Sequence, residues 1–247
     1  MRLACFGLLA LFAATAHAED KLLACVEDAD YPPFTYFERT GDKQIPKGST
    51  PAMVERLSRQ IGVPIEIVVT SMKRCLNGVE RGSFDIGMDF YRDAERNRKY
   101  DYSSPYLSLQ PHYYFDKTRF PDGLEVRSRA DLKRYRGCGV YSYSYEHFDL
   151  SEGPAFDTSS RSQTNAVRML FAGRCDYFPA EREVIEGYRL VGGAELADNP
   201  RLGLAPVADA PAPQLHFLYS KHSPRVQKLR PAIDAFLLTQ RKAVGGK

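Results

Sequence analysis

The sequence predicts an α/β fold organised around a mostly parallel sheet. Apolar, strand-like runs at residues 22–26, 65–69 and 84–88 alternate with helical patterns at 50–60 and 71–82. This order is typical of parallel strands joined by crossover helices. With 247 residues, the chain is long enough for one or two domains with a sizeable core.

Each element of the first half has its own local signal. Thr50 and Pro51 open the first helix, because proline is favoured in a first helical turn. Residues 65–69 are rich in β-branched side chains, as expected of a strand. Ser71 is the expected cap of the second helix, and Gly82 ends it.

The second half continues in the same way. Further strands are expected at residues 111–115, 137–141 and 215–220. The polar run 158–164 is expected to cap a helix that ends near residue 171. A last helix is expected to start at Ser223, with apolar side chains on one face.

The first 18 residues have the features of an export signal. A positive Met1-Arg2 start precedes an apolar run, and Ala16-His17-Ala18 fits the small-x-small cleavage rule. The alternative is a membrane anchor, but the apolar run is short for a bilayer. We therefore predict a signal peptide at residues 1–18, cleaved on export, and a soluble mature protein.

Composition excludes several classes of function. The net charge of +3 is scattered without a basic block, so nucleic-acid binding is not indicated. The sequence has no Ser-His-Asp order, phosphate loop or metal-like spacing, and we expect no metal or cofactor. Four dispersed histidines are expected at the surface or in the core: His112, His147, His216 and His222.

The mature chain retains an even number of cysteines, which are Cys25, Cys75, Cys138 and Cys175. An exported protein meets an oxidising compartment, so disulfides are expected. Four cysteines allow three pairings, and four reduced, buried thiols are the alternative.

Several residues near predicted strand ends are ligand candidates. Arg96 follows the strand at 84–88, and a guanidinium is a rigid fork of donors suited to a carboxylate. The alternative is a solvated loop charge. Asp89 lies in the same stretch, and Arg74 lies near the carboxyl edge of the sheet, where α/β proteins bind ligands.

This stretch resembles a known family signature. Glu95-Arg96, residues 99–103 and Pro105-Tyr106 are similar to a motif of bacterial extracellular solute-binding proteins, family 3, which bind polar amino acids and related solutes. The resemblance implies that Arg96 holds a ligand carboxylate. Where the family usually has Ser or Thr three residues earlier, this chain has Asp93, an acceptor that would repel a carboxylate.

Three further segments extend the resemblance. Tyr31 and Phe34 lie in a segment similar to the family's aromatic cleft loop. Glu181 matches an acid that binds the ligand's ammonium group, with a helix-start glutamate as the alternative. A tyrosine- and serine-rich segment stands where the family has a Gly-Thr or Gly-Ser pair, and it makes Ser142 or Ser144 the hydroxyl donor and Tyr143 an aromatic wall.

The resemblance implies a two-lobed, type II periplasmic-binding-protein-like fold with mixed, mostly parallel sheets and a two-strand hinge. Lobe 1 would comprise residues 19–106 and 213–247, and lobe 2 residues 107–212. This architecture favours the pairs Cys25–Cys75 and Cys138–Cys175, one within each lobe.

The implied function is capture of a small polar solute, an amino acid or amino-acid-like compound, between closing lobes. The implied partner is an ABC permease, and a monomer without enzymatic activity is expected. The alternatives are an enzyme of the cyclohexadienyl or arogenate dehydratase type, with Glu181 facing Arg96, and a ligand-sensing subunit of a receptor. The identity of the ligand stays open.

Overall fold

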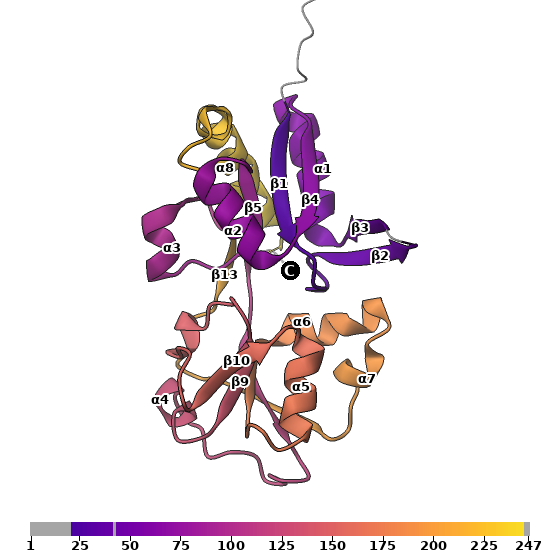
Figure 1. Cartoon of the computed structure of the whole chain (residues 1–247), viewed down its shortest axis with the longest axis vertical. Coiled ribbons are helices and arrows are strands. Elements are labelled where there is room, and N and C mark those ends of the chain that lie inside the picture. Colours follow the sequence, from indigo (N-terminus) through magenta and orange to yellow (C-terminus); the bar gives the residue numbers. More distant parts are fainter. Residues whose placement is uncertain (1–20, 42, 245–247) are drawn as a thin grey trace, which may run out of the picture.

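The computed structural model describes residues 21–41 and 43–244. The predicted signal peptide lies outside these residues. The chain forms two α/β lobes, one above the other in Figure 1. This arrangement, with its mixed sheets, confirms the predicted fold class.

The first lobe is built on a six-stranded sheet. Its main path runs β4-β1-β5-β13-β6, and β7 pairs with β13. Strand β1 is parallel to β4 and β5, whereas β13 is antiparallel to β5, β6 and β7. The strands are β1 (Leu22–Glu27), β4 (Ile65–Thr70), β5 (Ile86–Phe90), β6 (Asp101–Tyr102), β7 (Leu107–Ser108) and β13 (Gln214–Tyr219).

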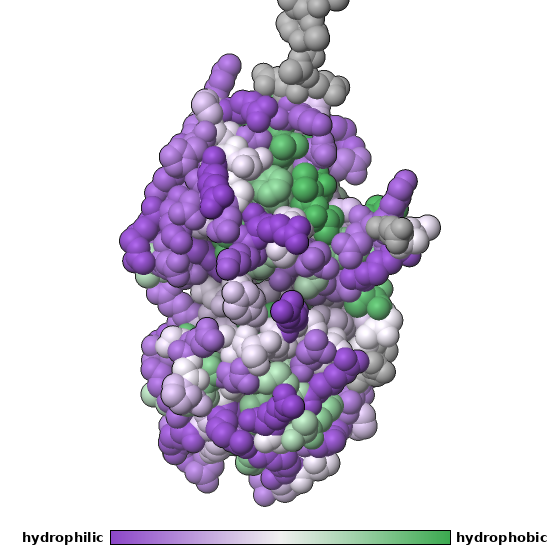
Figure 2. Space-filling view, viewed as in Figure 1, coloured by the Kyte–Doolittle hydropathy of each residue, from purple (hydrophilic) through white to green (hydrophobic). Residues whose placement is uncertain are grey.

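Helices cover this sheet, and a hairpin projects from it (Figure 1). The helices are α1 (Ser49–Ile61), α2 (Met72–Arg81), α3 (Ala94–Lys99) and α8 (Pro224–Val244), and the hairpin strands are β2 (Tyr36–Thr40) and β3 (Lys43–Lys47). The side chain of Ser71 caps α2 and Gly82 ends it with φ 78°, as predicted. Figure 2 shows apolar side chains gathered over β1 and β4 on a face that is otherwise mostly hydrophilic.

The second lobe combines two small sheets. Strand β8 lies between β11 and β12 in an antiparallel sheet, and β9 is parallel to β10. The strands are β8 (Pro111–Asp116), β9 (Gly137–Val140), β10 (Phe156–Ser160), β11 (Phe178–Glu181) and β12 (Leu202–Pro206). The helices are α4 (Arg129–Leu132), η1 (Glu146–Phe148), α5 (Gln163–Phe171), α6 (Arg182–Gly187), η2 (Tyr188–Val191) and α7 (Ala194–Ala197).

Two strands connect the lobes. Between β6 and β8 the chain leaves the first lobe, and between β12 and β13 it returns. The crossing segments pair with each other, since Tyr106 and Leu109 donate backbone hydrogen bonds of 3.0 and 2.9 Å to Leu215 and Pro213. Within the described residues no helix has both the length and the apolar character needed to cross a membrane.

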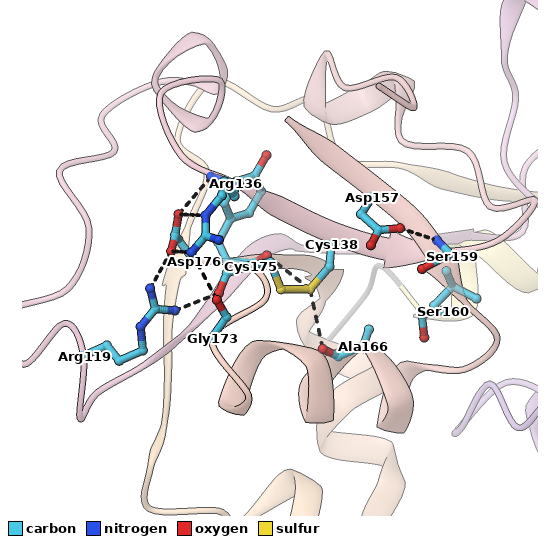
Figure 3. Close-up of a disulfide and its surroundings, with 12 residues drawn as sticks. Arg119, Arg136, Cys138, Asp157, Ser159, Ser160, Ala166, Gly173, Cys175 and Asp176 are labelled. Carbon is cyan, nitrogen blue, oxygen red and sulfur yellow. Dashed lines mark hydrogen bonds and ion pairs between the residues drawn. A yellow bond between two sulfur atoms is a disulfide. The ribbon is translucent and has the colours of Figure 1, made fainter. Parts of the chain in front are cut away.

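Each lobe contains one disulfide. Cys25 on β1 is joined to Cys75 on α2, and Cys138 on β9 is joined to Cys175 in the turn before β11 (Figure 3). These are the pairs favoured from the sequence. Because each bond closes a loop within one lobe, it constrains that lobe without linking it to the other.

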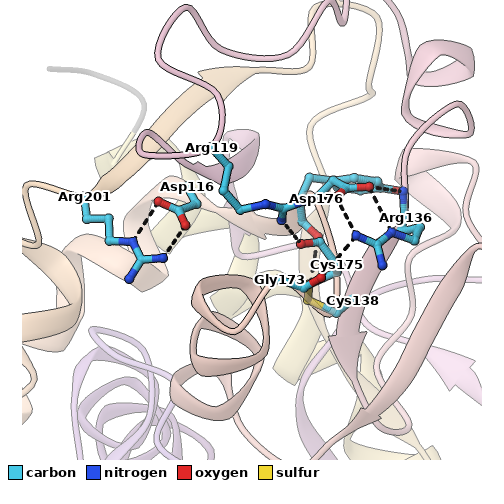
Figure 4. A network of polar contacts seen from close by, with 9 residues as sticks. Asp116, Arg119, Arg136, Cys138, Gly173, Cys175, Asp176 and Arg201 are labelled. Carbon is cyan, nitrogen blue, oxygen red and sulfur yellow. Dashed lines mark hydrogen bonds and ion pairs between the residues drawn. A yellow bond between two sulfur atoms is a disulfide. The ribbon is translucent and has the colours of Figure 1, made fainter.

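Asp176, beside the second disulfide, forms ion pairs with two arginines. Its carboxylate pairs with Arg119 at 2.7 Å and Arg136 at 2.9 Å, and Arg119 also donates to the Cys175 carbonyl (Figure 4). Burial alone would raise the pKa of Asp176, but the hydrogen bonds from these arginines together lower it below its usual value. The contacts of Asp176 and Arg119 therefore fix the turn that carries Cys175.

Candidate functional site

The two lobes meet through polar contacts. The Tyr143 hydroxyl donates to the Glu27 carboxylate at 2.8 Å, and the Tyr188 hydroxyl donates to the Asp30 carbonyl at 3.1 Å. The Ala94 amide donates to the Glu146 carboxylate at 2.9 Å. These bonds join residues of the first lobe to residues of the second, so the structure shows the lobes closed on each other.

A small cavity of about 40 Å³ lies inside this interface. Its walls come from both lobes and combine carboxylates, aromatic rings and one arginine: Val26, Glu27, Ala29, Tyr31, Thr35, Met72, Met88, Asp89, Phe90, Tyr91, Arg96, Tyr143 and Ser144. A solvent-open groove of about 1030 Å³ shares Arg96, Tyr143 and Ser144 with the cavity. Ligand sites are commonly about 300–1,000 Å³, so a whole solute enters this cleft only when the lobes separate.

The cavity lies at the carboxyl edge of the parallel strands. Glu27 is the last residue of β1, and Asp89 lies near the end of β5. Parallel strands place their carboxyl ends at one edge of a sheet, where open α/β proteins bind ligands. Asp89 has a φ of 61°, a conformation uncommon for residues other than glycine and often found at functional sites.

Neutral groups hold Asp89 in place. Its carboxylate accepts hydrogen bonds from the hydroxyls of Thr50 at 2.7 Å, Tyr106 at 2.8 Å and Thr35 at 2.5 Å. Burial raises the pKa of Asp89, and the three hydroxyls act in the opposite direction. The carboxylate is therefore oriented by neutral hydroxyl donors.

Glu27 has an even more perturbed titration. Burial raises its pKa from 4.5 to about 7, against the hydrogen bond from Tyr143. Asp28 raises the pKa further, and Arg96 has the smallest effect, in the lowering direction. A carboxyl group with a pKa near neutrality at the wall of a cleft is a feature of functional sites.

Arg96 is held by protein oxygens. Its Nε lies 3.2 Å from the Asp93 carboxylate, and its two terminal nitrogens donate to the carbonyls of Tyr91 at 3.3 Å and Ser142 at 3.0 Å. Asp93 also caps α3, since it accepts from the Arg96 amide at 2.7 Å. The guanidinium stacks at 5.3 Å from the centre of the Phe90 ring.

Glu181 belongs to a buried group behind the cavity wall. Its carboxylate lies 3.0 Å from Nε2 of His147 and accepts a hydrogen bond of 3.3 Å from the Tyr31 hydroxyl. The hydroxyls of Tyr31 and Tyr91 contact each other directly. Burial raises the pKa of both tyrosines well above the usual value, so both are neutral donors here.

Comparison with known proteins identifies the family. The model of bacterial extracellular solute-binding proteins, family 3, matches residues 23–242. The chain belongs to this family. The L-cystine-binding protein TcyA of Bacillus subtilis (strain 168) is 20% identical over 166 residues, which are 67% of this chain and 59% of that relative.

Solved structures of other proteins share the fold. An amino acid ABC transporter substrate-binding protein, AbpA from Streptococcus pneumoniae bound to L-arginine, has a TM-score of 0.69 at 21% identity and covers 91% of this chain and 90% of its own. A histidine kinase sensor domain with similarity to periplasmic binding proteins has a TM-score of 0.70 at 19% identity, covering 92% and 93%. At these identities the likeness shows the fold and not the ligand.

Most of the predicted ligand-binding residues lie around the cleft. The cavity wall includes five of them: Tyr31, Asp89, Arg96, Tyr143 and Ser144. Ser142 adopts a φ of 64° and presents its carbonyl to Arg96.

The other predicted residues lie further away. Phe34 is buried with its ring 5.8 Å from that of Tyr31, and Glu181 stands behind Tyr31 outside the cavity lining of the described chain. Arg74 is exposed on α2.

Sequence reasoning missed other groups at the cleft. Glu27, Thr35 and Tyr91 line the cavity, and His147 pairs with Glu181. Glu27 carried a usable signal, because it directly follows a predicted strand of the parallel sheet. His147 carried none, since its position depends on the fold of the segment between β9 and β10.

Proposed function

We propose that this protein is a periplasmic solute-binding protein that captures a small polar solute, an amino acid or amino-acid-like compound, between its lobes. One observation carries the proposal: carboxylate, guanidinium and phenol groups from both lobes converge on one cavity at the carboxyl edge of the sheet. The proposed ligand-binding residues are Tyr31, Phe34, Arg74, Asp89, Arg96, Ser142, Tyr143, Ser144 and Glu181, to which we add Glu27 and Tyr91.

The proposed mechanism is hinge closure. Lobe 1, residues 19–106 and 213–247, and lobe 2, residues 107–212, would rotate about the paired crossing segments. Closure removes water from the cleft and strengthens each charge contact with the solute. The protein would be exported to the periplasm, where its signal peptide is cleaved after Ala18, and would act there as a monomer. An ABC permease would then recognise its closed form.

A binding role without catalysis fits the position of Glu181. The dehydratase hypothesis requires Glu181 to face Arg96 across a substrate. Instead, Glu181 pairs with His147 and Tyr31, whereas Arg96 pairs with Asp93. We therefore expect no product from prephenate or arogenate, and steady product formation would overturn this part of the proposal.

The test is a ligand screen with a site variant. Mature protein is mixed with amino acids, amines, opines, organic acids and short peptides, and the melting temperature is measured. A ligand at 100 times its Kd adds about 2.7 kcal/mol of stability, or several degrees for a protein of this size. The shift should disappear in Asp89→Asn and persist in Asp157→Asn, a variant of an exposed residue on β10.

Arg74→Ala belongs in the same screen. The side chain of Arg74 is exposed on the surface of the first lobe. Unchanged ligand affinity in this variant would therefore remove Arg74 from the proposed ligand-binding residues. A screen without any stabilising solute would refute the binding function. A shift that persists in Asp89→Asn would place the site elsewhere.

A further inference from the structure

We propose that the solute is an organic cation without a carboxylate, namely a primary amine or guanidinium compound. This inference rests on the proposed binding function and narrows it. Three features of the cleft carry it: two carboxylates that have no cation within ion-pair distance among the described residues, an arginine already bound by protein oxygens, and a wall of aromatic rings.

Neutral groups hold the two carboxylates that line the cavity. Glu27 accepts from the neutral Tyr143, and Asp89 accepts from three neutral hydroxyls. Among the described residues, neither carboxylate has a Lys, Arg or His within ion-pair distance. Buried negative charge without a partner is unfavourable, and burial accordingly raises the pKa of both groups. A ligand cation would supply the missing partner.

Arg96, the one arginine among the described residues that line the cavity, is bound by protein oxygens, so its role beside the ligand would not be to bind a carboxylate. Asp93 and Arg96 form an ion pair whose side chains are only 13% and 11% exposed. Two backbone carbonyls, of Tyr91 and Ser142, accept from the remaining ends of the guanidinium. A carboxylate entering here would approach the Asp93 carboxylate and two carbonyl oxygens, all of which repel it.

The rest of the wall suits a cation. The rings of Tyr31, Phe90, Tyr91 and Tyr143 line the cavity, and aromatic faces attract cations through their quadrupole. The volume of about 40 Å³ suits one small head group, such as an ammonium. The open groove that shares Tyr143 and Ser144 with the cavity gives the remainder of the compound a path outward.

Pairs of compounds that differ only in the carboxylate test the inference. Agmatine is compared with arginine, and cadaverine with lysine, by titration calorimetry of the mature protein at pH 8. We expect at least one amine to bind and to bind at least tenfold more tightly than its amino acid. Glu27→Gln and Asp89→Asn should each weaken that binding at least tenfold.

Asp93→Ser is the diagnostic variant. Serine caps a helix about as well as aspartate, so α3 keeps its cap while Arg96 loses its counter-charge. We expect the ratio of the two affinities, amine over amino acid, to shrink at least tenfold in this variant. The change should come from tighter binding of the amino acid, while the affinity for the amine stays the same. An unchanged preference would contradict the role assigned to Asp93 and Arg96.

The possible outcomes separate the two proposals. The inference would be overturned if arginine or lysine bound as tightly as its amine or more tightly. It would also be overturned if any other carboxylated or neutral solute in the screen bound as tightly as the amines. Either result would leave the binding function intact. The absence of every binder would overturn both.

Discussion

The carboxyl group of Glu27 should make the thermal stability of the protein depend on pH, and replacing Glu27 by glutamine should remove this dependence. In the folded protein, burial raises the pKa of Glu27 from 4.5 to about 7. The folded state therefore binds this proton more tightly than the unfolded state. The resulting stabilisation is complete below pH 4.5 and is lost as the pH rises through about 7.

The size of the effect follows from the two pKa values. Between pH 5 and pH 8, a change of pKa from 4.5 to about 7 corresponds to a loss of about 2.5 kcal/mol. For a protein of this size, that is a fall in Tm of about 5–10 °C. Glutamine keeps the shape of the side chain and carries no charge at either pH. The Tm of Glu27→Gln should thus match that of the wild type at pH 5 and exceed it at pH 8.

The assay is thermal unfolding of both proteins across pH 5–8. Asp89 also has a raised pKa and contributes in the same direction, but its contribution cancels in the difference between the two proteins. The exposed Glu152, changed to glutamine, serves as the control and should leave the pH profile unchanged. A Tm difference between Glu27→Gln and the wild type that is the same at pH 5 and pH 8 would refute the reasoning.

Three further predictions concern the disulfide of the second lobe, the ion pair of Asp116 with Arg201, and closure. Changing Cys138 and Cys175 to serine opens a loop with a sequence separation of 37 and should cost about 4 kcal/mol in chemical denaturation; an unchanged midpoint would contradict the expected constraint. Asp116→Asn should cost about 2 kcal/mol at pH 7. Arg201, the partner of Asp116, lowers the pKa of this carboxyl group from 3.8 to about 2. The loss of stability caused by Asp116→Asn should therefore decline as the pH falls from 3.8 through 2. A loss of stability that persists below pH 2 would exclude the ion pair as its source. In Gly187→Ala the new Cβ would lie 2.5 Å from the backbone of Pro32 in the opposite lobe. The lobes should then close less fully, so small-angle X-ray scattering should show a more extended molecule and ligand affinity should fall. An unchanged scattering profile would contradict the closed contact.

The fold was predictable because its signals are local. The β-branched run at 65–69, the Ser71 cap and the Gly82 terminus each report on a few neighbouring residues, and the structure has β4 and α2 in those places. The disulfide pairs followed from the family architecture rather than from cysteine spacing. Side-chain partners that lie far apart in sequence left no comparable local pattern.

The candidate site was predictable only in part for the same reason. Asp93 and Arg96 have a spacing at which side chains on a helix interact, and the N-cap with its ion pair could have been inferred from it. His147, by contrast, reaches Glu181 through the path of the chain between β9 and β10. Until that path is known, neither the partner of Glu181 nor its distance from the cavity can be inferred.

The division of charge between the lobes explains how closure can depend on the solute. Glu27 and Asp89 come from the first lobe, whereas the second lobe contributes the hydroxyl of Tyr143 and the carbonyl of Ser142. A cation bound to the first lobe would neutralise its carboxylates before closure removes them from water. The second lobe then adds a hydroxyl and a carbonyl, which carry no charge that needs its own partner. An unliganded cleft must instead bury Glu27 as the acid, and this makes closure without a ligand less favourable as the pH rises above about 7.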